Sequence, residues 1–173
     1  MDELTVFNIA LTPFNIELTD LDKSNDRTVR LCRRLLPDAI RMAQREHNWT
    51  FLTVRLDMDY EADAEGVGCM GYSHGYPIPS GVFKLVDTGI RHKVIGNLYC
   101  TDVEEPEVYG MMNVVPEEGV PDDWWALVAY ALSYLLAPAI APGSNLSEEI
   151  LRRYTWVATG LVNDEAKNNR YED

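Results

Sequence analysis

The sequence predicts an α+β fold that is mainly α-helical: a helical bundle with a small antiparallel β region inserted in it. Near both ends of the chain, apolar residues recur every three or four positions, which is typical of amphipathic helices. Between residues 72 and 115 this period gives way to short β-like runs bounded by glycine and proline. The 173 residues, 46% apolar and 25% charged, suit one globular domain. We therefore expect a single domain over 1–173, with an extended C-terminal tail over 163–173.

Two helices are predicted in the first 47 residues. The segment 4–14 has a short helical pattern that is closed by Pro13. A longer helix is expected over about 24–47, with Ser24 as its N-cap. Proline inside a helix removes one backbone donor, so we expect a kink just before Pro37 and no separation into two helices. The apolar stripe of this helix consists of Val29, Cys32, Leu36, Ile40 and Ala43.

The opposite side of the second helix is basic, although the chain as a whole is acidic. Residues 23–47 contain seven Lys and Arg but only three Asp and Glu. One interpretation is a solvated face, because exposed charges contribute little to stability. The other is a contact with another molecule. The basic residues of this face are Arg27, Arg30, Arg34, Arg41 and Arg45.

The β insertion over about 72–115 is expected to form a small antiparallel sheet or meander. Four β-like runs lie within it, at 82–87, 90–96, 97–102 and 108–115. Before the first run, prolines in GYPIPSG favour an extended backbone. Upstream of the insertion, three further residues look strand-forming or core-filling: Trp49, Phe51 and Val54.

Two more helices, over about 122–137 and 147–166, are expected to pair as an antiparallel hairpin. Asp122 is the expected N-cap of the first. The stretch 124–142 carries no charged side chain. Its prolines, Pro138 and Pro142, leave about 21 Å of uninterrupted helix, short of the roughly 30 Å needed to cross a bilayer. We interpret the stretch as a core helix and expect no membrane span.

Small residues on both helices indicate close helix packing. On the first helix they are Ala126, Ala129, Ser133 and Ala137, spaced three or four apart. On the second helix Gly160 costs about 1 kcal/mol relative to alanine, which suggests that a close contact uses the missing side chain. The apolar stripe of the second helix consists of Ile150, Tyr154, Val157 and Leu161.

Charge and cysteine content restrict the possible functions. A formal net charge of −13 argues against a protein that grips nucleic-acid phosphates, because such binding depends on Lys and Arg. Three cysteines, without a CxxC pair, support neither a disulfide framework nor a zinc site, so we expect reduced thiols. These cysteines are Cys32, Cys69 and Cys100.

An acidic loop, DMDYEADAEG, places carboxylates at every second position and invites a calcium interpretation. That interpretation fails because a calcium loop of the EF-hand kind needs Gly at position six and Glu at position twelve, where this chain has Ala62 and Gly68. We therefore expect no metal site and no cofactor. The carboxylates concerned are Asp57, Asp59, Glu61, Asp63 and Glu65.

Neither a zincin motif, HExxH, nor a P-loop motif, GxxxxGK followed by Ser or Thr, occurs in the sequence. The histidines, His47, His74 and His92, lie in different predicted elements, and we interpret them as surface or structural residues. Glu46, next to His47 and near Trp49, is the one carboxylate with neighbouring aromatic residues that would suit the general acid of a glycoside hydrolase. A helix end followed by a packed Trp explains it better, so we predict no enzyme.

Taken in order, these segments resemble the head-to-tail adaptor family of tailed phages, also called tail tubular protein A or head-completion connectors. The resemblance rests on the proline-bearing, arginine-rich helix that ends in Trp49-x-Phe51, the GYPIPSGVFKLV entry to the β region, and the Ala-rich hairpin followed by an Asn-rich tail. It covers most of the chain, and the order of the segments carries it. The acidic loop has no counterpart in that pattern.

The resemblance implies a structural subunit of the virion, made in the host cytoplasm, that forms a ring at the head-tail junction. In this family the ring is a dodecamer under the portal protein, extends the DNA channel and provides the platform for nozzle or tail-tube proteins. DNA would pass through the lumen without specific binding. Subunit contacts would use the five arginines above with Trp124 and Trp125. Portal binding would use Asn163, Asp164, Lys167, Asn168, Asn169, Arg170 and Tyr171.

Two other functions stay open from the residues alone. A virion-associated peptidoglycan hydrolase would use Glu46 as its acid. A small module for divalent ions would use the acidic loop.

Overall fold

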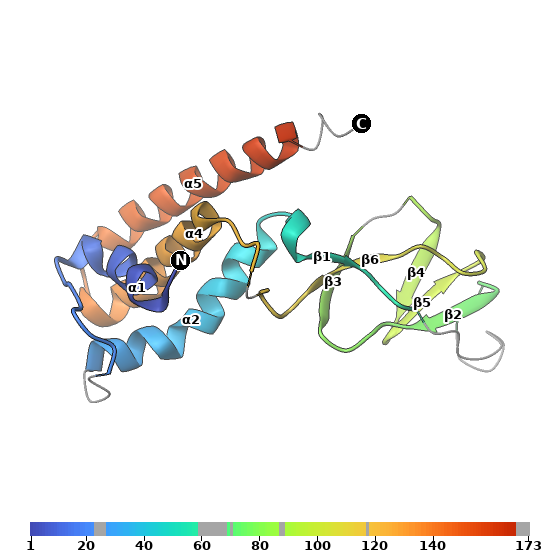
Figure 1. Cartoon of the computed structure of the whole chain (residues 1–173), viewed down its shortest axis with the longest axis horizontal. Helices are drawn as coiled ribbons and strands as arrows, with labels where there is room; N and C mark the ends of the chain where they lie inside the picture. The colour runs from blue at the N-terminus through green and yellow to red at the C-terminus, as the bar shows by residue number, and fades with distance from the viewer. Residues whose placement is uncertain (23–26, 59–68, 70, 87–88, 117, 169–173) are drawn as a thin grey trace. The chain divides into compact units, whose positions relative to one another are not determined.

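The computed structural model describes residues 1–22, 27–58, 69, 71–86, 89–116 and 118–168 (Figure 1). These described residues form four α-helices and two three-stranded antiparallel sheets, which confirms the α+β, mainly α-helical class. The chain divides into two compact units. We call Met1–His47 with Glu118–Asp173 the helical unit, and Asn48–Glu117 the β unit.

The first helix, α1 (Glu3–Leu11), begins after an N-cap side chain. The carboxylate of Asp2 accepts a hydrogen bond from the amide of Thr5 at 2.8 Å. Hydrogen bonding by the side chain of Thr5, and then by its amide, lowers the pKa of Asp2. The helix was predicted to end at Pro13; it ends at Leu11 and is followed by a short 3₁₀ turn, η1 (Thr12–Phe14), which contains this proline. Beyond it, the side chain of Asn8 bonds both the amide and the carbonyl of Leu18, at 2.7 and 3.0 Å. These two bonds fix the return of the chain along α1.

The second helix, α2 (Arg27–Arg45), is continuous through Pro37, as predicted. Ser24, the expected N-cap, lies outside the described residues. The guanidinium of Arg33 makes two hydrogen bonds to the carboxylate of Glu3, at 3.2 and 3.3 Å, and so ties α2 to α1. The predicted apolar stripe is confirmed: Val29, Cys32 and Ala43 are buried, and Leu36 and Ile40 are half-buried.

Helix α4 (Asp122–Ile140) is the core of the helical unit and contacts α1, α2 and α5 (Figure 1). Two details of its prediction were wrong. Pro121 takes the N-cap position, so Asp122 is the first helical residue. The helix also continues past Pro138, because proline removes only its own amide, and the amide of Ala141 still bonds the carbonyl of Ala137 at 2.9 Å.

The uncharged stretch packs as a core helix in this structure. Among the described helices, α4 is the one long and apolar enough to cross a membrane by length and composition, and half of the relevant window is buried inside the protein. Close packing explains its small residues, since three of the four are fully covered. The buried side chains of α4 are Trp124, Leu127, Val128, Ala129, Ala131, Leu132, Ser133, Leu136 and Ala137.

Helix α5 (Leu146–Asn168) follows a short connection and packs against α4, as expected for a helical hairpin. The expected extended tail is corrected over 163–168, which are helical. Near the end of this helix the carboxylate of Glu165, with 14% of its side chain exposed, lies 3.6 Å from Nε2 of His47, which follows α2. Residues 169–173 lie outside the described part of the chain.

Gly160 corrects a further expectation about α5. We predicted that another part of the chain would pack closely where its side chain is missing. Within the described residues, a Cβ at this position would meet nothing within 4 Å. Gly160 is therefore an exposed gap on the surface of α5.

The β unit begins with a 3₁₀ turn, η2 (Thr50–Leu52), and contains two sheets where one sheet or meander was expected. One sheet has the order β1 (Thr53–Arg55), β6 (Tyr109–Met112), β3 (Val82–Val86). The other has the order β2 (His74–Pro77), β5 (Leu98–Thr101), β4 (His92–Ile95). All pairs are antiparallel. The four predicted runs each contain a strand; β2, in the proline-rich entry, is an additional one.

Two features hold these sheets in place. The turn between β4 and β5 starts at Gly96, whose φ of 62° is one that residues with a side chain rarely adopt. Side chains from both sheets and their flanks then share one core: Leu56, Tyr76, Tyr99 and Val108, with Ile78, Val82 and Met112 packed against them.

Cys69 and Cys100 form a disulfide, so the prediction of reduced thiols was wrong for these two residues. Cys100 lies in β5, directly opposite Gly75 of β2. The glycine makes room for the bond, because a Cβ at position 75 would lie 2.8 Å from Sγ of Cys69. Both sulfur atoms belong to buried residues of the β unit. The third cysteine, Cys32, is buried in α2.

Candidate functional site

The arginines of α2 lie on the surface, as the sequence predicts, but their surroundings differ. All five are exposed: Arg27, Arg30, Arg34, Arg41 and Arg45. Toward the C-terminal end of the helix, Arg41 lies 3.6 Å from Asp38, and Arg45 stands in the last turn, where the helix dipole favours a positive charge. The other three line a groove of about 390 Å³ together with Leu31 and Ala139. We call it the arginine groove.

The tryptophan pair expected at subunit contacts has a different location. Trp124 is only 1% exposed and belongs to the core of the helical unit. Trp125 is half-buried, and its ring meets that of Trp124 edge-on, with the ring centres 5.2 Å apart. Trp124 therefore has almost no surface for a partner, whereas Trp125 keeps part of its ring accessible.

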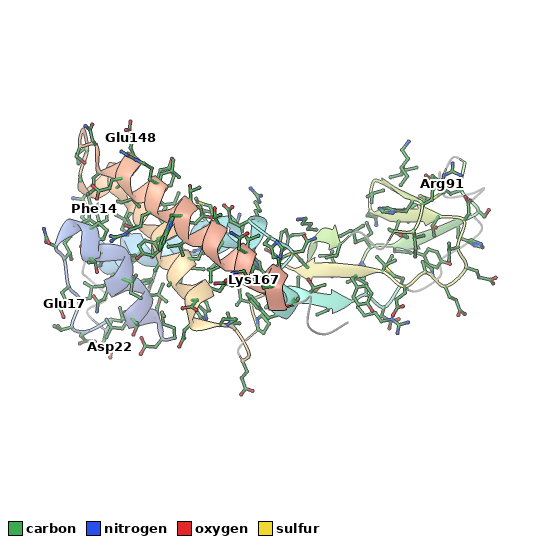
Figure 2. All side chains as sticks on the ribbon, turned by 90° about the horizontal axis from the view of Figure 1, so that it is seen from above. Phe14, Glu17, Asp22, Arg91, Glu148 and Lys167 are labelled. Carbon is green, nitrogen blue, oxygen red and sulfur yellow. A yellow bond between two sulfur atoms is a disulfide. The ribbon has the colours of Figure 1, made fainter. Side chains whose placement is uncertain are left out.

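Helix α5 exposes a face of which only the last part was predicted from the sequence. Trp156 is 76% exposed, the highest value among the exposed large apolar residues of the described chain. At helical spacings of three or four residues it is followed by four exposed residues, which with it we call the α5 face: Trp156, Gly160, Asn163, Asp164 and Lys167. Figure 2 shows that the side chains of Glu148 and Lys167 mark opposite ends of this helix.

Three of the predicted portal-binding residues thus continue the exposed face that starts at Trp156. Asn163, Asp164 and Lys167 are exposed, and the ammonium of Lys167 lies 3.1 Å from the carboxylate of Asp164. Asn168 is the last residue of α5. The remaining candidates, Asn169, Arg170 and Tyr171, lie outside the described residues. The sequence contained the signal for Trp156, because two residues beyond Tyr154 a helix has turned to its opposite side.

Glu46, the residue considered as a catalytic acid, is engaged in the packing of α5. Its carboxylate accepts a hydrogen bond from the hydroxyl of Tyr154 at 2.7 Å. Burial, and then this hydrogen bond, raise the pKa of Tyr154 well above its ordinary value, so the phenol stays protonated and donates. Next to it, His47 faces Glu165. These contacts fasten the C-terminal end of α2 to α5.

The β unit contains a larger cavity, of about 760 Å³, that sequence reasoning did not identify. Its wall is organised by Tyr76, whose hydroxyl accepts a hydrogen bond from the amide of Glu105 at 3.0 Å and donates one to the carbonyl of Val103. Glu105 has a φ of 55°, a conformation unusual for a residue with a side chain. The residues that line the cavity are Arg55, Leu56, Asp57, Met58, His74, Tyr76, Glu104, Glu105 and Pro106.

The other candidate ligands are distributed over separate elements. His92 lies in β4, where its ring stacks on that of Tyr99 with the centres 4.7 Å apart. His74 lies in β2 and lines the cavity. In the described part of the chain, no group of three or more His, Cys, Asp or Glu is placed to hold a metal ion. Of the acidic loop, Asp57 is described; Asp59, Glu61, Asp63 and Glu65 lie outside the described residues.

Comparison with known proteins adds no family to this description. No protein-family model matches the chain, and no curated protein is significantly similar to it in sequence.

Proposed function

We propose that this protein is a structural head-to-tail adaptor of a tailed phage. It assembles as a ring under the portal protein, extends the channel for DNA and carries the tail proteins. In this proposal it is a component of the virion at the head-tail junction and performs no chemical reaction. The proposal starts from the order of sequence segments that resembles this family, and the fold class is compatible with it.

The α5 face is the observation that carries the proposal. A tryptophan that is 76% exposed is unusual, because burial of its large apolar ring is favourable. At an interface the ring can be buried while the indole N–H donates a hydrogen bond, and tryptophan is enriched at protein interfaces for this reason. Gly160, one turn further, lets a partner approach the helix backbone closely. Asn163 and Lys167 add polar groups on the same side. Such a combination supports a protein partner, and the resemblance assigns the end of this segment to the portal.

A portal-binding experiment tests this proposal. Full-length protein is mixed with purified portal rings of the same phage, and the dissociation constant is measured by biolayer interferometry. Replacing Trp156 by alanine is expected to weaken binding by roughly 30-fold, the effect of removing a central aromatic contact worth about 2 kcal/mol.

Leu151→Ala is the matched control, since Leu151 is also apolar and 40% exposed on α5 but lies on another side of the helix. It is expected to bind within about twofold of the wild-type protein, as for a residue outside the interface. Equal affinity of the Trp156 variant and the wild type would exclude the α5 face, and failure of the wild type to bind portal rings would exclude the adaptor function.

A further inference from the structure

The arginine groove lies between the first half of α2 and the last turn of α4. Three arginines stand along it at positions i, i+3 and i+7 of α2, so their guanidinium groups share one face of the helix. Between them the groove has apolar contributions from Leu31 of α2 and Ala139 of α4. A concave surface thus combines three positive charges with two apolar side chains. The three arginines are Arg27, Arg30 and Arg34.

Within the described chain, these three guanidinium groups have no carboxylate partner, in contrast to neighbouring arginines of the same helix. Arg33 is held by Glu3 at 3.2 Å, and Arg41 lies 3.6 Å from Asp38. The contrast is informative because the chain contains 28 acidic residues and could have supplied carboxylates here too. Three like charges also repel one another, so an anion from outside would relieve that repulsion. The guanidinium fork binds a carboxylate or a phosphate through two parallel hydrogen bonds.

The composition of the groove favours a protein segment over a nucleic acid. A phosphate backbone gains affinity from many cationic contacts along its length, and a net charge of −13 opposes its approach to the chain as a whole. A phosphate also gains nothing from the apolar side chains of the groove. A polypeptide, by contrast, places an apolar side chain next to its carboxylates and so matches both parts of the groove.

A second copy of the chain is the partner that fits best. Copies of a strongly acidic protein repel one another, so their association needs a surface where opposite charges meet. At physiological salt, charges more than about 8 Å apart are largely screened, while contacts at about 4 Å keep most of their attraction. Within the described residues, the arginine groove provides that local complement to the acidic surface of a neighbour.

We propose that the arginine groove binds a carboxylate-bearing segment of a neighbouring copy of this protein and forms the electrostatic part of the subunit contact. This inference rests on the proposed assembly into a ring and names the surface that joins its subunits.

Charge reversal tests this inference. The test variant is Arg27→Glu, Arg30→Glu, Arg34→Glu; the control variant is Lys84→Glu, Arg91→Glu, Lys93→Glu, which reverses three exposed charges of the β unit. Both variants change the net charge equally. Association of full-length protein is measured at about 0.15 M salt, the physiological ionic strength, by sedimentation velocity, alone and on portal rings. Circular dichroism confirms folding, and if the reversed variant unfolds, the triple Arg→Gln variant takes its place.

The groove variant is expected to associate at least about 100-fold more weakly than wild type and control, because interfacial charge pairs are replaced by repulsion. Assembly of the groove variant at wild-type strength would overturn the inference and leave the adaptor proposal intact. The same holds if a short DNA duplex or inorganic phosphate binds the wild type through these arginines while subunit association is unaffected. A wild-type chain that stays monomeric with and without portal rings would overturn both.

Discussion

Replacement of Leu132 by alanine is expected to lower the free energy of unfolding by about 3–5 kcal/mol. Leu132 is fully buried in α4, the helix that contacts α1, α2 and α5. Truncation there removes transfer free energy and leaves a cavity that three packed helices cannot readily fill. Because a domain is stable by only about 5–15 kcal/mol, this change removes a large part of the total. Urea unfolding followed by circular dichroism at 222 nm measures it.

Leu151→Ala provides the comparison at equal chemistry. Leu151 is 40% exposed, so its truncation is expected to cost less than about 1 kcal/mol. A loss of similar size in both variants would contradict the assignment of α4 as the core helix. It would also revive the question whether the uncharged stretch is covered by something other than its own bundle.

Removal of the disulfide is the second change with a large expected effect. It links positions 31 apart, and loop closure of that length stabilises a folded chain by about 3–4 kcal/mol. The double variant Cys69→Ser, Cys100→Ser is therefore expected to lose that amount. Since both cysteines lie in the β unit, hydrogen exchange followed by mass spectrometry should show the loss of protection in peptides from 48–117.

Reduction of the wild-type protein is the matching experiment. A phosphine reductant should lower the protection of wild-type β-unit peptides to the level of the double variant, and should leave the double variant unchanged. Wild-type protection that is insensitive to reductant would show that the bond between Cys69 and Cys100 does not stabilise the β unit.

The helices were predictable because their signal is local. In α2 the helical spacing of Val29, Cys32 and Ala43 predicts the buried face, and the arginines between them mark the exposed face. The boundaries were less certain for a physical reason. The local pattern predicted this helix to about 166, and α5 ends at Asn168. Near that end Glu165 lies 3.6 Å from His47, more than a hundred positions earlier, and a local pattern contains no information on such a contact.

The β unit depends on contacts between distant positions, and there the prediction was weaker. Two sheets form because β6 pairs with β1 and β3, while β5 pairs with β2 and β4. The disulfide follows from that register, which brings Cys100 opposite Gly75. A glycine within a strand was the available hint, since it often marks the close approach of another group.

The candidate surfaces were predictable in part. The exposure of the α2 arginines follows from helical periodicity, but the groove needs Ala139 from α4 and so requires the fold. Trp124 was expected at a contact between subunits but lies in the core of the helical unit, whereas Trp156 is exposed on α5. A count of aromatic residues could not distinguish them; their positions relative to the buried stripe of each helix could.

The central claim is that copies of this protein assemble on a portal. The most direct measurement is the mass and symmetry of the wild-type protein, alone and mixed with portal rings, by light scattering and electron microscopy. We predict a complex in which a closed ring of copies covers one end of the portal. A protein that remains a single chain in the mixture, with portal rings unchanged, would contradict the account.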